Sequence, residues 1–226
     1  MILVPAMSLE DWKKLAAEPD VQWTPGSPMN ALATRWHGLI RFPPEISSLF
    51  SGSDATRGAT LLLAIPEHHV PLAGGARASQ TDLWLLARTP LGLLSVVVEG
   101  KVSESFGPSV GDCQAGETRG TRERWTALCG LLEIEPASDG AIRYQLLHRT
   151  ATALLEARRF CARGAAVIVH SFSQSCDGFG DFQHFVRLMG GFIKVPGTLA
   201  AVPSREGIEL FFGWAQGPVV NDTPSS

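Results

Sequence analysis

Residues 81–101 read TDLWLLARTPLGLLSVVVEGK. Two runs rich in apolar residues flank a short segment, Thr89-Pro90-Leu91-Gly92, that carries the proline and glycine of a tight turn. We therefore expect strands over residues 81–88 and 93–102, joined as a β-hairpin. The three valines at 96–98 mark the second strand as buried.

The hairpin would bring two acidic side chains together. With the turn centred between Pro90 and Leu91, Asp82 lies directly across from Glu99. Side chains opposed in this way have Cβ atoms about 4.5–5.5 Å apart. Lys101 shares a face with Glu99, because residues two apart in a strand point to the same side.

Facing carboxylates at the end of an apolar strand need a partner, because they repel one another and are costly to remove from water. A cation between them is the arrangement of a metal site. Mg²⁺ and Mn²⁺ prefer carboxylate and carbonyl oxygens, so we expect metal ligands at Asp82, Glu99 and the carbonyl of Gly100. The ion would polarise a phosphoryl oxygen and acidify a bound water, and Lys101 would orient that water or stabilise negative charge. The competing interpretation is a structural ion pair at the end of the sheet.

Length and composition are typical of one large, well-packed domain. The chain has 226 residues, of which 45% are hydrophobic. The net charge of −3 argues against a broad basic surface of the kind that binds duplex nucleic acid by charge alone. A small local phosphate site is compatible with this balance.

The cysteine pattern and the N-terminus indicate a cytoplasmic protein. The four cysteines are scattered without a C-x-x-C pair, which is typical of free thiols in a reducing compartment. The first residues lack the basic region of a signal peptide. No apolar run approaches the roughly 20 residues of a membrane helix, so no membrane partner is expected.

Helix caps and apolar periodicity predict the remaining elements. Helices are expected at residues 9–15 (capped by Ser8), 28–36 (opened by Ser27 and Pro28), 45–50, 122–132, 142–163 and 181–189. Further strands are expected at residues 61–65 (closed by Pro66), 165–169, 199–202 and 208–214, and a loop at 111–120.

The order of these elements favours the α/β class, with a mixed central β-sheet flanked by helices. We expect a single domain over residues 1–218. Its core covers about 28–170, a C-terminal helix and strand pair cover 181–215, and residues 219–226 form a flexible tail.

Asp82 followed by Glu99-Gly100-Lys101 at the end of the adjacent strand resembles the PD-(D/E)XK signature of the restriction-endonuclease-like nucleases. The expected order of helix, three strands, helix and strand is similar to the core of that superfamily. Three stretches also resemble a bacterial group of uncharacterised proteins with this presumed fold: RASQTD (77–82), VEGKVSESFG (98–107) and YQLLHRT (144–150).

The resemblance implies that Asp82 and Glu99 bind metal and that Lys101 assists catalysis. It also implies that the helix after the third strand lends polar residues to the site, here Gln145 as a catalytic residue and His148, Arg149 and Thr152 as substrate contacts. Many members add a glutamate from the first core helix. Residues 28–37 hold no acid, so Glu45 or Glu67 would take that place.

The leading functional hypothesis is a nuclease or phosphodiesterase that depends on Mg²⁺ or Mn²⁺ and acts on nucleic acid or another phosphodiester. The alternative is a catalytically inactive, nuclease-like interaction or regulatory protein. A third hypothesis is an enzyme of another type that acts on a small phosphorylated ligand, which the negative net charge would suit. The sequence leaves the substrate and the oligomeric state open.

Overall fold

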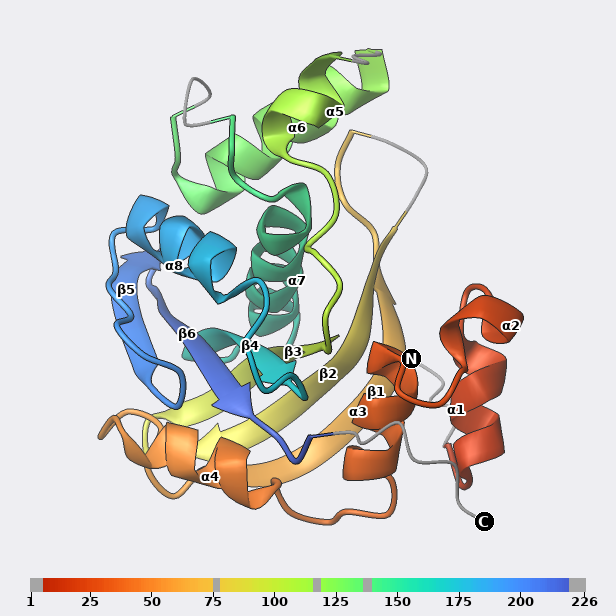
Figure 1. The fold of residues 1–226 in the computed structure, drawn as a ribbon. Helices are drawn as coiled ribbons and strands as arrows, with labels where there is room; N and C mark the ends of the chain where they lie inside the picture. The colour runs from red at the N-terminus through yellow and green to blue at the C-terminus, as the bar shows by residue number, and fades with distance from the viewer. Residues whose placement is uncertain (1–5, 75–77, 116–118, 136–139, 220–226) are drawn as a thin grey trace.

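A six-stranded mixed β-sheet forms the centre of the computed structural model, which describes residues 6–74, 78–115, 119–135 and 140–219 (Figure 1). The strands lie in the order β1-β2-β3-β4-β6-β5. Their bounds are β1 Thr60–Val70, β2 Ser79–Thr89, β3 Gly92–Lys101, β4 Gly164–Ser171, β5 Leu199–Arg205 and β6 Ile208–Gln216. The first three strands pair antiparallel, β3, β4 and β6 run parallel, and β5 closes the far edge antiparallel to β6.

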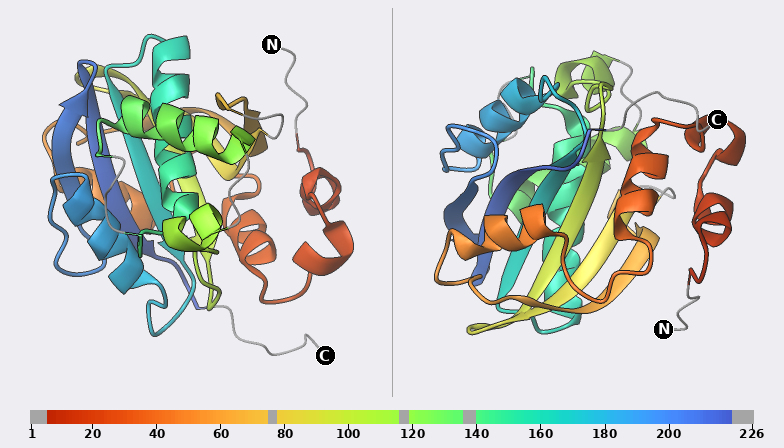
Figure 2. Two further views of the ribbon diagram at one scale, coloured as in Figure 1. Left: turned by 90° about the horizontal axis from the view of Figure 1, so that it is seen from above. Right: turned by 60° about the horizontal axis from the view of Figure 1, so that its bottom comes forward.

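Helices cover both faces of this sheet (Figure 2). One face is covered by α6 (Arg119–Leu132), α7 (Tyr144–Arg159) and α8 (Phe179–Leu188), and the other by α1 (Leu9–Leu15), α3 (Pro28–Trp36) and α4 (Pro44–Ser51). Two short helices, α2 (Pro19–Gln22) and α5 (Val110–Ala115), complete the set in the described residues. The expected α/β class with helices on a mixed sheet is thereby confirmed.

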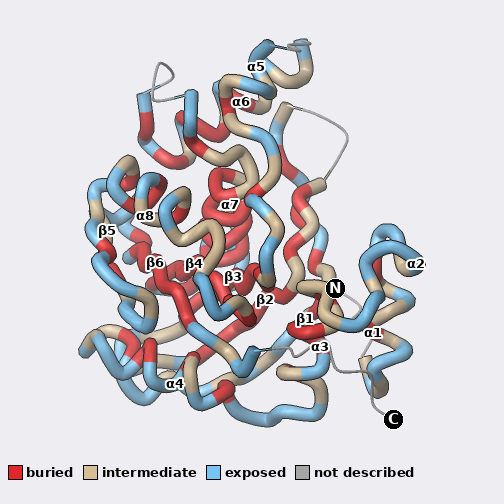
Figure 3. Tube along the Cα trace, in the orientation of Figure 1, coloured by how far each residue is buried: buried red, intermediate tan, exposed pale blue. Residues whose placement is uncertain are grey.

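The β2–β3 hairpin has the predicted register. Leu83 pairs with Val98, and Thr89 pairs with Gly92 at the turn. Val97 faces the core under α7, whereas Val96 and Val98 face the core under α3 and α4. Buried residues accordingly run along the central strands and α7 (Figure 3).

The predicted end of the first strand at Pro66 is wrong, because β1 continues to Val70. β1 is an edge strand, so the missing N–H of proline leaves no ladder partner unsatisfied on its open side. Glu67 follows with a positive φ of 49°. The extension carries Glu67 alongside the beginning of β2.

The predicted loop at residues 111–120 is also wrong where the structure describes it. Ser109 Oγ accepts from the amide of Asp112 at 3.1 Å, and the Asp112 carboxylate accepts from the Ser109 amide at 2.9 Å. This reciprocal capping, together with burial of Val110, starts α5. α6 begins at Arg119, three residues earlier than expected. Residues 116–118 and 220–226, which the loop and tail predictions include, lie outside the described residues.

No helix among the described residues is long and apolar enough to cross a membrane.

Candidate functional site

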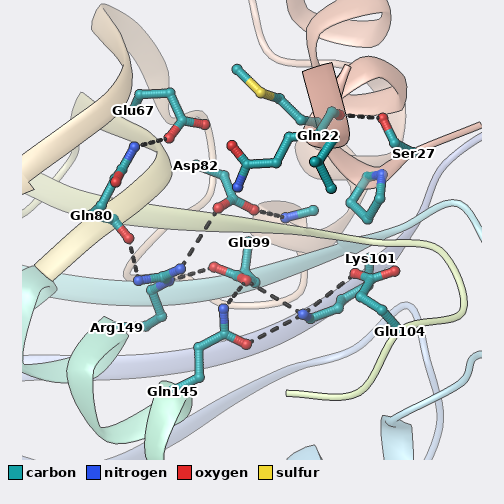
Figure 4. A pocket seen from close by; sticks show the side chains of 14 residues that line it. Gln22, Ser27, Glu67, Gln80, Asp82, Glu99, Lys101, Glu104, Gln145 and Arg149 are labelled. Atoms are coloured by element: carbon teal, nitrogen blue, oxygen red, sulfur yellow. Dashed lines mark hydrogen bonds and ion pairs between the residues drawn. The ribbon is translucent and has the colours of Figure 1, made fainter. Parts of the chain in front are cut away.

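A pocket of about 400 Å³ lies where β2 begins and β3 ends, between the α2–α3 segment and α7 (Figure 4). It gathers four carboxylates, an arginine and a lysine from distant parts of the chain. The lining residues are Val21, Gln22, Ser27, Pro28, Met29, Glu67, Gln80, Asp82, Glu99, Gly100, Lys101, Glu104, Gln145 and Arg149.

The hairpin places Asp82 and Glu99 in this pocket. The pairing of Leu83 with Val98 puts Asp82 next to Glu99 at the end of the hairpin. The Oδ2 of Asp82 accepts a hydrogen bond of 2.8 Å from the amide of Gly100. Glu99 is only 2% exposed, and the Asp82 side chain retains 24% of its surface. The predicted closeness of the two carboxylates follows from the strand register.

The guanidinium of Arg149 lies between these carboxylates. Its Nε donates to Glu99 Oε2, and its Nη2 lies 3.6 Å from Asp82 Oδ1. Its Nη1 donates to the backbone carbonyl of Gln80. Arg149 is therefore a buried cation with two hydrogen-bond acceptors and, at ion-pair distance, the Asp82 carboxylate.

Lys101 is 3% exposed and lies on the opposite side of Glu99. Its Nζ is 3.5 Å from Glu99 Oε1 and 3.4 Å from Glu104 Oε1, and it lies 4.7 Å above the ring of Phe106. Gln145 connects the two groups, because its Nε2 donates to Glu99 at 2.5 Å and its Oε1 accepts from Lys101 at 3.3 Å. The lysine is held rigidly in the pocket wall.

The structure separates the two candidates for an additional acid. Glu67 lines the pocket and accepts a hydrogen bond of 2.6 Å from the side chain of Gln80. Glu45 lies elsewhere, where it accepts hydrogen bonds of 2.7 Å from Nε and Nη2 of Arg35 and pairs with His170 at 2.9 Å. Of these two glutamates, Glu67 is the one that lies close to the Asp82–Glu99 pair.

The carboxylates of the pocket differ in their affinity for protons. Burial, and then the negative charge of Glu99, raises the pKa of Asp82 to about 7. Burial, and then the charge of Asp82, raises the pKa of Glu67 to about 8. Burial also acts to raise the pKa of Glu99, but Arg149 and Lys101 outweigh it and lower that pKa. Glu99 is thus the acid held in its charged form beside Arg149 and Lys101, whereas Asp82 and Glu67 retain protons up to near-neutral pH.

Two of the predicted substrate contacts do not line the pocket. His148 packs against the ring of Tyr144, with ring centroids 4.4 Å apart, and burial lowers its pKa to about 4. Thr152 is fully buried and donates to Ser79 Oγ at 3.0 Å. A helix turns about 100° per residue, so His148 points well away from Arg149, and Thr152 lies almost a turn further along the axis.

Several other residues line the pocket, and the sequence contains little or no indication that they belong to it. Gln80 precedes Asp82 by two residues, and Glu104 follows Lys101 by three. The wall formed by Gln22 and Ser27 comes from a distant segment whose position depends on packing. Ser27 Oγ accepts from the amide of Asn30 as the cap of α3 and donates to the carbonyl of Gln22, which joins α2 to α3.

The donors of the pocket suit a hard divalent ion in type and in charge. Asp82 and Glu99 supply carboxylate oxygens, and burial, followed by the charge of Glu99, raises the pKa of Asp82 in spite of the opposing effect of Arg149. Within the described ranges, however, no three His, Cys, Asp or Glu side chains are grouped closely enough to hold a metal ion. The cation between the two carboxylates in this structure is Arg149.

Fold and site together define a mixed α/β protein with a charged pocket at the sheet edge where β2 begins and β3 ends. The chain belongs to the DUF6946 family, described as a domain of unknown function, whose family model matches residues 5–219. No curated protein and no solved structure matches the chain significantly.

Proposed function

We propose that this protein is a metal-dependent nuclease or phosphodiesterase of the PD-(D/E)XK type. The observation that carries the proposal is the meeting of Asp82 with Glu99, Gly100 and Lys101 in one pocket, with the Asp82 carboxylate bound to the Gly100 amide. The succession of α3, the β1–β3 meander, α7 and β4, with β4 parallel to β3, supports a restriction-endonuclease-like core.

In this proposal Asp82, Glu99 and the carbonyl of Gly100 would hold Mg²⁺ or Mn²⁺. The ion would supply Lewis-acid activation of the phosphodiester and of a water molecule. Lys101 would orient that water or stabilise negative charge on the phosphorus oxygens. Gln145 positions Lys101 and Glu99 relative to one another through its two hydrogen bonds.

The substrate class in this proposal is nucleic acid or another phosphodiester. The pocket holds four carboxyl groups and two cations, and those carboxyl groups that are ionised oppose the approach of a polyanion. A divalent ion would remove this repulsion, so substrate binding should require the metal.

We also propose a cytoplasmic location for the protein. The free cysteines of the described chain support a reducing compartment.

One observation favours a second candidate, a catalytically inactive interaction or regulatory protein. Arg149 and Glu99 form a buried ion pair that needs no metal. In such a protein the charges would fix the packing of α7 on the sheet and would do no chemistry.

Thermal unfolding with and without Mg²⁺ or Mn²⁺ separates the two candidates. A ligand at a hundredfold excess over its Kd stabilises by about 2.7 kcal/mol, which for a chain of this size raises Tm by about 5–10 °C. We expect such an increase in the wild type and none in Glu99→Gln. An unchanged Tm of the wild type at saturating metal would favour the inactive candidate.

Hydrolysis is tested on single-stranded, duplex and structured nucleic acids and on a small chromogenic phosphodiester. We expect Lys101→Ala to abolish hydrolysis. Lys14→Ala is the matched control, because Lys14 lies on α1 in an exposed pair with Asp11, and its activity should equal that of the wild type. Hydrolysis that survives Lys101→Ala would place the chemistry at another site.

A further inference from the structure

The guanidinium of Arg149 occupies the position that a metal bound to both carboxylates would need. It spans Glu99 Oε2 and Asp82 Oδ1, and it is tied to the sheet through the carbonyl of Gln80. Arginine stays protonated at every pH at which the protein is folded. A divalent ion between the same carboxylates would therefore meet a fixed positive charge.

Arg149 cannot simply withdraw from the carboxylates. It is 7% exposed, and a buried guanidinium without an anionic partner is strongly disfavoured. The other carboxylates of the pocket offer little relief. Glu67 is engaged by Gln80, and Glu104 lies on the far side of Glu99 beside Lys101. Release of Asp82 and Glu99 thus requires an anion that enters from outside.

A phosphodiester is such an anion. Arg149 lines the pocket, so a phosphate there lies within reach of its guanidinium. The planar guanidinium donates two parallel hydrogen bonds to phosphate as readily as to a carboxylate. Lys101 is less suited to this exchange, because it is surrounded by Glu99, Glu104 and the Gln145 oxygen.

We propose that Arg149 is an exchangeable counter-ion that couples metal binding to phosphate binding. Without substrate it neutralises Asp82 and Glu99. When a phosphodiester enters, the guanidinium transfers to the phosphate and the divalent ion takes its place on the carboxylates. The inference rests on the proposed function, and it adds that the ion and the phosphate each bind more weakly when the other is absent.

Such coupling is reciprocal, and its usual size is about 5- to 150-fold in affinity. It also predicts the effect of removing the guanidinium. Arg149→Met keeps the aliphatic stem but lacks the charge, so the carboxylates are open to the ion at all times. The metal should then bind tightly without phosphate, and phosphate should no longer change its affinity.

The test is a Mn²⁺ titration of the full chain followed by electron paramagnetic resonance, with and without dimethyl phosphate as a minimal, slowly hydrolysed phosphodiester. A protein-free titration corrects for complexes formed in solution. In the wild type we expect dimethyl phosphate to lower the Kd for Mn²⁺ by about fivefold or more. In Arg149→Met we expect the lower Kd in both conditions.

Arg143→Met is the matched control. Arg143 precedes α7 and pairs with Asp181 outside the pocket, so its replacement should leave the coupling as in the wild type. Arg149→Lys is a second variant, since a lysine keeps the charge but cannot span both carboxylates. We expect its coupling to be smaller than that of the wild type.

A wild-type Kd for Mn²⁺ that dimethyl phosphate leaves unchanged would overturn the coupling, and this measurement stands even if Arg149→Met fails to fold. If Mn²⁺ binds equally well in every condition and variant, the coupling is wrong and the proposed metal site stands. If Mn²⁺ binds neither the wild type nor Arg149→Met with dimethyl phosphate present, the proposed metal-dependent function falls as well.

Discussion

Asp82 and Glu99 are neighbours with opposite pKa shifts, and the difference comes from their partners. Glu99 has a hydrogen-bonded arginine, a hydrogen-bonded glutamine and a nearby lysine, which favour its charged form. Asp82 has a single amide donor and an arginine nitrogen at 3.6 Å, so burial and the charge of Glu99 prevail. The protein therefore keeps one acid charged and the other close to its titration point at neutral pH.

Asp82→Asn tests this difference through the pH dependence of stability. The folded-state pKa of Asp82 is raised to about 7 from an unfolded value of about 3.9, so the folded protein holds the extra proton between these values. Its stability then falls as pH rises through this window. Measured with chelator, the unfolding free energy of the variant relative to the wild type should rise by about 3 kcal/mol from pH 4.5 to pH 8.

The comparison with the variant removes the contributions of groups that lie away from Asp82, whereas Glu67, whose pKa is raised by the charge of Asp82, contributes to the difference. The buried His170 has a lowered pKa and acts in the opposite direction near its unfolded value, but it is present in both proteins. A difference curve that stays flat from pH 4.5 to pH 8 would show that Asp82 is charged throughout.

At the scale of elements, the helices of the α3–α4 side are fixed to the sheet by a polar chain and by close packing. Trp36 Nε1 donates to His170 Nδ1 at 3.0 Å, which leaves the other ring nitrogen to pair with Glu45 at 2.9 Å. Gly213 in β6 makes room for Leu49 of α4. A Cβ at Gly213 would lie 2.6 Å from Leu49 Cδ2 and 3.0 Å from Ile168 Cδ1.

Gly213→Ala should therefore overpack the contact between β6 and α4. Insertion of a methyl group into a filled core costs about 1–3 kcal/mol of unfolding free energy. Gly130→Ala is the matched control, because Gly130 is exposed in α6 and a Cβ there meets nothing within 4 Å. That change should leave stability equal or raise it by up to about 1 kcal/mol. Urea denaturation measures both, and equal effects of the two variants would contradict the packing argument.

At the scale of the whole molecule, one sheet serves two cores. Trp36 lies in the core under α3 and α4, and Trp84 and Trp214 lie in the core under α7 and α8. The central strands contribute alternate residues to both cores. Loss of either helical layer thus exposes one face of the strands that hold the other layer.

We expect a single cooperative unfolding transition on this basis. Tryptophan fluorescence reports both cores, and far-UV circular dichroism reports the backbone of all elements. The two signals should give the same midpoint and the same slope in urea with chelator present. Midpoints that differ between the two signals, or two steps in either of them, would mean that one helical layer unfolds independently of the other.

The hairpin and its register were predictable from the sequence, because both depend on neighbours in the chain. The turn at residues 89–92 sets the pairing, and the two-residue period of a strand then places Asp82 beside Glu99 and puts Lys101 on the same face. The spacing of Gln145 and Arg149 likewise places them on one helix face. The part of β1 after Pro66 was not predicted, because proline is tolerated at the edge position that β1 occupies. Helix α5 was not predicted, because its capping pair outweighs the local glycine signal.

The sequence by itself thus determined the α/β class and the meeting of two acids with a lysine at the end of a strand, since short-range geometry is enough for both. The tertiary structure alone decided which partners those charges meet. In the folded chain Arg149 lies between the two acids. Glu67 lines the pocket, whereas Glu45 pairs with His170. Gln22 and Ser27 form one wall of the pocket. These choices depend on how α7 and the N-terminal helices pack on the twisted sheet, and residue spacing along the chain does not encode that packing.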